Sequence, residues 1–232
     1  MAEAFIIGDG MQVTCRRSAR ARRMTLRVPR DGGTVVLTLP LHVALSAGAA
    51  FAESRLPWLL QAVDRRPLPS IARHGAMMPV AGAPLMLTAA DVRVAAVSEG
   101  ALLLPTGRPA GAVAQAFLKH RAMQALRAAC DRHAATLGHG YRALVLRDTR
   151  SRWGSCTSDG RLMFSWRLAM APPAVLDYVA AHEVAHLRHM DHSPRFWATV
   201  TELMPDHAPH RAWLRRHGAD LMAWRFHDPE GD

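Results

Sequence analysis

A five-residue pattern in the C-terminal part of the chain, His182-Glu183-Val184-Ala185-His186, constrains the fold more than any other feature. Residues four apart on an α-helix lie one above the other on the same face, so both histidines can present their imidazoles to one ion. Neutral imidazole is a good ligand for Zn²⁺, and a glutamate beside the ion can take a proton from an attacking water. The pattern predicts a helix that carries a zinc site, with Glu183 as the general base.

A catalytic zinc has three protein ligands, so a third donor is needed. His189 falls on the same helical stripe but about 10.5 Å farther along the axis than the first histidine, at about 1.5 Å per residue. His192 is the better candidate, because Ser193 can cap a new helix and Pro194 suits its first position. A chain that breaks here can return His192 to the ion, and His189 is then a solvated residue or a partner of a ligand.

The 232-residue chain is 50% hydrophobic and 21% charged, which is typical of a soluble protein with one or two domains. The N-terminus lacks the basic start and apolar run of a signal peptide, and no stretch approaches the roughly 18 apolar residues of a membrane span. We therefore expect a cytoplasmic protein with no membrane partner. Three widely spaced cysteines without a C-x-x-C pair predict reduced thiols. The oligomeric state stays open.

The formal charge of +10 is carried almost wholly by arginine, since Lys119 is the only lysine. Arginine suits the recognition of phosphate and carboxylate groups. Five arginines crowd one segment near the N-terminus: Arg16, Arg17, Arg20, Arg22 and Arg23. They could bind an anion, although we favour a solvated face whose long side chains cover apolar surface. A nucleotide or nucleic acid is therefore a weakly supported partner.

Residues 1–107 are predicted to form a small β-rich domain. Alternating apolar residues and turn signals predict strands around residues 24–28, 35–39, 85–88, 92–94 and 101–104, the first two as a hairpin. Residues 46–65 have helical character, and Pro57 predicts a kink or a restart within them. Trp58 is expected to be part of the core, as large apolar residues usually are.

Residues 108–232 are predicted to form a second domain, so the fold class is α+β. It begins with a long helix over residues 110–137 that Gly138 closes. Two strands follow at residues 142–147 and 161–168, the metal helix starts at Pro172-Pro173, and two more helices cover residues 194–203 and 208–224.

Four motifs follow one another in this domain: Arg152-Trp153-Gly154-Ser155-Cys156, Tyr178-Val179, His182-Glu183-x-x-His186 and His192-Ser193-Pro194-x-Phe196-Trp197. Together they resemble the YgjP-like zinc metallopeptidases, relatives of the SprT and WLM groups within the zincins. The resemblance implies a zincin-like catalytic domain behind the β-rich domain. It also implies that His182, His186 and His192 bind zinc and that Glu183 is the base. In zincins whose third ligand is a glutamate, that residue lies on a later helix, which makes Glu202 the weaker alternative.

In the same resemblance, the strand around residues 162–166 would be the sheet edge beside the cleft, where an extended peptide could add as another strand. Arg152 and Phe164 are accordingly the predicted substrate-binding residues. Arg152, Tyr178, His207 and His210 are candidates to stabilise an oxyanion.

The predicted function is a zinc-dependent metallopeptidase that acts on a protein or peptide with a metal-activated water and a glutamate base. A metal-dependent hydrolase of nucleotide phosphoanhydrides is the first alternative, in which the arginines would hold the nucleotide. The second is a zinc-containing nucleic-acid-binding module with a closed, four-ligand metal site.

Overall fold

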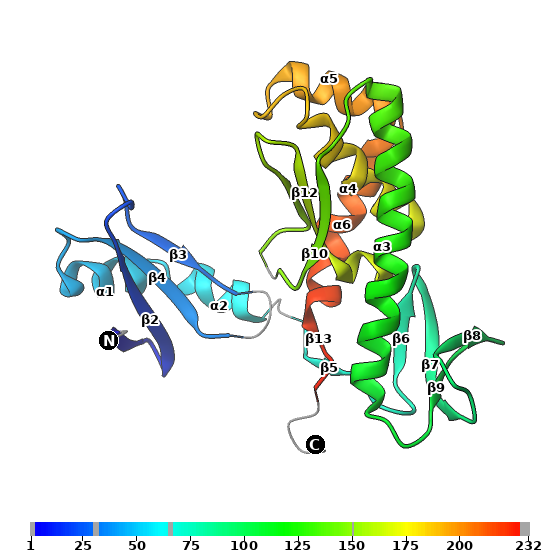
Figure 1. Cartoon of the computed structure of the whole chain (residues 1–232). Helices are drawn as coiled ribbons and strands as arrows, with labels where there is room; N and C mark the ends of the chain where they lie inside the picture. Colours follow the sequence, from blue (N-terminus) through cyan, green and yellow to red (C-terminus); the bar gives the residue numbers. More distant parts are fainter. Residues whose placement is uncertain (1–2, 30–32, 65–66, 150, 228–232) are drawn as a thin grey trace. The chain divides into compact units, whose positions relative to one another are not determined.

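The structure is a computed structural model that describes residues 3–29, 33–64, 67–149 and 151–227, and Figure 1 shows the order of its helices and strands. Its contacts divide the chain into an N-terminal unit, Met1–Leu68, and a C-terminal unit, Pro69–Asp232. Both contain helices and strands, which confirms the α+β prediction.

The N-terminal unit combines a four-stranded sheet of order β1-β2-β4-β3 with two helices. Its elements are β1 (Glu3–Ile7), β2 (Met11–Ser18), β3 (Thr25–Arg27), β4 (Val35–Pro40), α1 (Leu45–Ser54) and α2 (Leu56–Asp64). Alternate residues of β2 and β4 are buried, as the period of two requires for a strand with one face on a core. Gly48 lets α1 approach β4 closely, because a Cβ there would lie 2.9 Å from the Leu37 and Leu39 side chains.

The helical segment of this unit restarts beside Pro57, as its sequence predicts: α1 ends at Ser54 and α2 begins at Leu56. The expectation that Trp58 is a core residue is wrong, because its side chain is 48% exposed. The adjacent Leu59 is completely buried instead. Successive residues of a helix point in different directions, so one of the two had to face away from the core.

The first part of the C-terminal unit is a four-stranded sheet of order β6-β7-β9-β8. Its strands are β6 (Met77–Val80), β7 (Ala83–Ala90), β8 (Ala96–Ser98) and β9 (Ala101–Pro105), and the short β5 (Ser70–Ile71) precedes them. The strand predicted at residues 92–94 does not form, and β8 lies just after it.

This sheet explains why the chain divides at residue 68 and not at the predicted residue 107. Met78, Leu87 and Leu102 are completely buried, and they belong to the same hydrophobic core as Leu118 of the long helix that follows. A sheet whose buried face is covered by the next helix cannot be a separate domain from that helix.

The rest of the C-terminal unit surrounds a second sheet of order β10-β12-β11. Its elements are α3 (Ala110–Leu137), β10 (Ala143–Arg147), β11 (Gly154–Cys156), β12 (Arg161–Ser165), the 3-10 helix η1 (Trp166–Met170), α4 (Pro173–Ala185), α5 (Pro194–Leu203), α6 (His207–Ala223) and β13 (Trp224–Arg225). The long α3 contacts β9 of the first sheet and β10 of the second, so it joins the two sheets (Figure 1). Within the described part of the chain, no helix combines the length and apolar character needed to cross a membrane.

Arg167 of η1 is a polar anchor inside this unit, with only 2% of its surface exposed. Its guanidinium donates hydrogen bonds to the Asp148 carboxylate (3.1 Å) and to the carbonyl oxygens of Leu221 (3.2 Å) and Trp224 (3.0 Å). It also lies 4.5 Å from the centre of the Trp166 ring. One side chain therefore connects η1 to the end of α6.

We expect Arg167→Met to lower the free energy of unfolding of the C-terminal unit by about 2–4 kcal/mol, because two buried carbonyl groups lose their donor. The control is Arg142→Met, which removes an ion pair to Asp159 whose partners are 63% and 47% exposed. Such exposed pairs contribute about 0–1 kcal/mol. Urea denaturation of both variants measures the difference, and equal effects would contradict the anchoring role of Arg167.

Candidate metal centre

The candidate site lies where α4 ends. The helix starts with Pro173 in its first turn, ends at Ala185, and has His186 as its C-cap. The Ser193 hydroxyl then accepts a hydrogen bond from the Phe196 backbone N–H (3.5 Å) and begins α5, with Pro194 in the first turn. The break between the two helices lies where Ser193 and Pro194 predict it.

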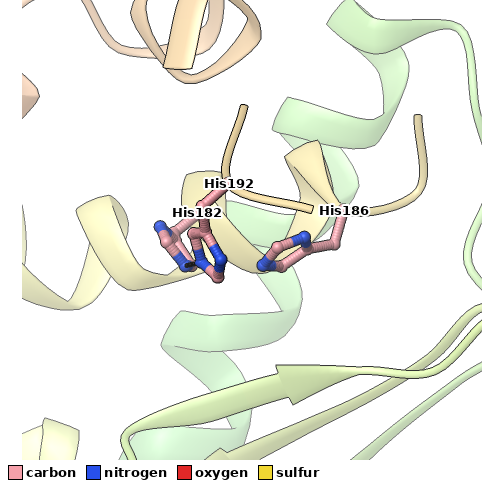
Figure 2. Close-up of side chains that lie close together, drawn as sticks. All are labelled: His182, His186 and His192. Atoms are coloured by element: carbon pink, nitrogen blue, oxygen red, sulfur yellow. Dashed lines mark hydrogen bonds between the residues drawn. The ribbon is translucent and has the colours of Figure 1, made fainter. Parts of the chain in front are cut away.

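This break brings three histidines together (Figure 2). Ligand nitrogens of His182, His186 and His192 all lie within 4.8 Å of one another, and His182 Nε2 is 3.2 Å from His192 Nε2. Two nitrogens bound to the same tetrahedral zinc at about 2.1 Å are about 3.4 Å apart, which is close to this separation. The three residues could therefore hold a single cation.

His186 and His182 are held in different ways. Nδ1 of His186 donates a hydrogen bond to the His189 carbonyl oxygen (2.9 Å), so its Nε2 is left as the nitrogen with a free lone pair. Nδ1 of His182 is buried without a hydrogen-bond partner among the described residues. The His182 ring is instead packed edge-on against the rings of Phe196 (4.9 Å between centres) and Tyr178 (6.0 Å).

The two other candidates for the third position do not join the cluster. His189 contributes its backbone carbonyl to the site, while its imidazole is not among the clustered rings. The Glu202 carboxylate instead accepts a hydrogen bond from the Arg188 guanidinium (3.1 Å). Among the described residues the geometry brings His192, and neither of its rivals, to His182 and His186.

Glu183 is a buried acid beside the three histidines, with 5% of its surface exposed. Burial raises the pKa of Glu183 to about 8, and the positive charge of Arg152 opposes that rise. A cation held by the histidines would favour the ionised carboxylate further. Gly154 of β11 makes room for the carboxylate, because a Cβ at this position would lie 2.5 Å from Glu183 Oε1.

A cavity of about 290 Å³ adjoins these residues, lined by the whole of β11 together with Arg152, Met190, Glu183 and the three histidines. A second cavity of about 550 Å³ shares His186 and Met190 with it, so the space beside the histidines extends along the turn between β11 and β12. A larger cavity of about 600 Å³ lies between α3, η1 and α4, and none of the clustered histidines lines it. Size alone therefore does not identify the site.

Two predictions about where a substrate would bind need correction. The strand at residues 162–166 is not the sheet edge, because β12 lies between β10 and β11. The edge beside the histidines is β11, which is not among the strands predicted from the sequence. Phe164 is completely buried on the central strand, so its ring cannot contact a substrate.

Arg152 does line the small cavity, as its predicted role requires, although binding itself stays a prediction. Tyr178, His207 and His210 do not line it. Cys156 lines it too, but burial and the nearby Glu183 raise the pKa of its thiol to about 11. A thiol that stays protonated at neutral pH is a poor nucleophile, so Cys156 is part of the cavity wall.

We expect Gly154→Ala to destabilise the C-terminal unit by about 1–3 kcal/mol, because the new methyl group overlaps the Glu183 carboxylate. Gly140→Ala is the matched control, since a Cβ there meets no atom within 4 Å. That change should shift stability by less than about 1 kcal/mol, in the stabilising direction if any. Urea denaturation compares the two, and a Gly154→Ala protein as stable as the control would show that β11 and Glu183 are not in close contact.

A family model described as "YgjP-like, metallopeptidase domain" matches residues 22–217, a range that contains all the residues of the cluster. No curated protein matches the chain. Among solved structures, the crystal structure of the metallopeptidase zymogen of Pyrococcus abyssi abylysin is similar over 40% of this chain and 92% of that chain, at 18% sequence identity and a TM-score of 0.36.

Proposed function

The chain belongs to the YgjP-like family of metallopeptidase domains, and on that premise we propose that it is a zinc-dependent peptidase. In this proposal His182, His186 and His192 hold the metal and Glu183 is the general base. The observation that carries the proposal is the convergence of three imidazoles beside one buried carboxylate, all from α4 and the turn that follows it.

The donor set favours zinc among the first-row metals. Three neutral imidazoles leave one position open in a tetrahedral site, which is typical of catalytic rather than structural zinc. When bound, zinc supplies a Lewis acid that polarises the scissile carbonyl and makes water more acidic. The hydrogen bond from His186 to the His189 carbonyl supports this assignment, because it directs a nitrogen lone pair towards the other two histidines.

Glu183 is placed to move the proton. Its carboxylate would take a proton from the attacking water and deliver it to the nitrogen of the leaving amine, so that peptide cleavage ends with one new carboxyl group and one amine. The Glu183 side chain is buried in α4, packs against Gly154 of β11 and lines the cavity that the histidines also line. A positioned base of this kind contributes about 10²- to 10⁴-fold to a rate.

An extended peptide is the substrate that fits the surroundings. The outer side of β11 is a sheet edge beside the histidines, and a peptide chain can add to such an edge through backbone hydrogen bonds. Arg152, which lines the same cavity, would then contact the substrate backbone near the cleaved bond. The adjoining cavity of about 550 Å³ leaves space for a substrate side chain.

We expect the purified protein to bind about one equivalent of zinc. His192→Ala should weaken zinc binding by about 100-fold or more, because losing a residue that only hydrogen-bonds to a metal ligand already costs about 10- to 100-fold. His189→Ala is the control, because it keeps the backbone carbonyl that accepts the hydrogen bond from His186. Competition with a coloured zinc chelator measures both affinities. If His189→Ala loses as much affinity as His192→Ala, the ligand assignment is wrong.

We expect Glu183→Gln to keep its zinc and to lose about 10²- to 10⁴-fold in hydrolysis of a casein-like substrate, because the amide has the same shape but cannot accept the proton. Each assay is run with and without a chelator, and zinc content is measured on the same samples. A parallel incubation with a nucleoside triphosphate tests the alternative reaction. Chelator-sensitive phosphate release without casein cleavage would replace the peptidase proposal, and full activity of Glu183→Gln would remove Glu183 as the base.

A further inference from the structure

The N-terminal unit has a cavity of its own, of about 510 Å³, which the peptidase proposal does not use. Residues around β3 form one wall, including Arg23 and Leu26. Phe51 of α1, Arg55 at the junction of the two helices and Trp58 of α2 form the other. The volume lies within the range of about 300–1,000 Å³ that is typical of small-molecule sites.

The aromatic part of this cavity is Trp58. Its side chain is 48% exposed although the neighbouring Leu59 is completely buried, so α2 has its core contact without the tryptophan. Exposing a large ring to water forgoes the free energy that burial would give. An indole in the wall of a concave site is available to contact a ligand. Because the indole is planar, it stacks best on another planar ring.

The charged part is a pair of arginines, Arg23 and Arg55. The guanidinium of Arg55 lies 5.8 Å from the centre of the Phe51 ring, so an aromatic contact restrains it at the cavity wall. Both side chains are exposed. The first 68 residues contain ten arginines against five acidic residues, a formal charge of +5 that favours anionic partners for this part of the chain.

We propose that this cavity binds single-stranded nucleic acid, with a base stacked on Trp58 and the flanking phosphates paired with Arg23 and Arg55. A concave site lined by both an exposed aromatic ring and guanidinium groups combines the two features that proteins use to bind unpaired bases without sequence preference. An acidic peptide would use the charges and leave the ring without a partner. A duplex keeps its bases stacked inside, where Trp58 cannot reach them.

The site is separate from the histidine cluster, which belongs to the C-terminal unit. It therefore gives the chain a binding activity that does not depend on the peptidase proposal, and each can fail without the other. DNA and RNA single strands offer the same base and phosphate chemistry, and the experiment distinguishes them.

The experiment uses the full chain and fluorescein-labelled oligo(dT) and oligo(U) of about 12 nucleotides, within the usual size of such sites. Anisotropy titrations should show binding to one or both strands. Trp58→Ala should weaken it about 5- to 150-fold, the effect of losing one stacked base, and Trp58→Phe should keep most of the affinity. Leu60→Ala is the matched control, because Leu60 is 54% exposed on the same helix but does not line the cavity. It should bind as the unchanged protein does.

The arginines are tested by salt dependence. Each phosphate contact on a single strand adds about 0.7 to the slope of log affinity against log salt, so Arg23→Gln and Arg55→Gln should each reduce that slope by about 0.7. Arg93→Gln, an exposed arginine of the C-terminal unit, should leave it unchanged. The proposal is overturned if Trp58→Ala binds like Leu60→Ala, or if duplex DNA or polyglutamate binds as tightly as the single strands.

Discussion

The geometry of the candidate metal site depends on the end of α4 at Ala185. In an unbroken helix, His192 would lie about 15 Å along the axis from His182, at about 1.5 Å per residue. The turn instead returns His192 to within 3.2 Å of His182, nitrogen to nitrogen. The same turn presents the His189 carbonyl to Nδ1 of His186. One local break therefore supplies the third imidazole and also orients the second.

Glu183 shows why the surrounding fold must be rigid. Burying an ionised carboxylate is unfavourable unless it is paired with a positive charge. The pKa of Glu183 is raised for this reason, because burial favours the protonated form. Helix α4 cannot remove the carboxylate from this environment by rotating, because α3, α5, α6 and β11 all contact the helix and nine of its thirteen residues are buried. Only Gly154, without a side chain, allows β11 to lie against the acid. Packing thus holds the group in place, and a cation beside it would offset the unfavourable burial.

The elements predicted correctly from the sequence are those determined by residues close together in the chain. Helix α3 was predicted over its full length, because it lacks internal proline and ends at Gly138, which has the left-handed backbone that favours glycine. The histidine cluster followed from a spacing of four and a proline-marked break. The strand order β10-β12-β11 could not be predicted, because β10 pairs in parallel with β12 and β11 comes between them in the chain. The errors about Phe164, the sheet edge and the residue 107 boundary all arise from such long-range packing.

The net charge of +10 also proves a poor guide by itself, because the arginines differ in their surroundings. Arg167 lies in the core as a donor to backbone carbonyls, where its charge is unavailable to any ligand. Arg188 is paired with Glu202, the residue that the sequence offered as an alternative third ligand. Arg55 is held against Phe51 at an open cavity. A guanidinium buried in the core or paired with an acid is less available to a partner than one at an open cavity, so the location of each arginine is more informative than the net charge.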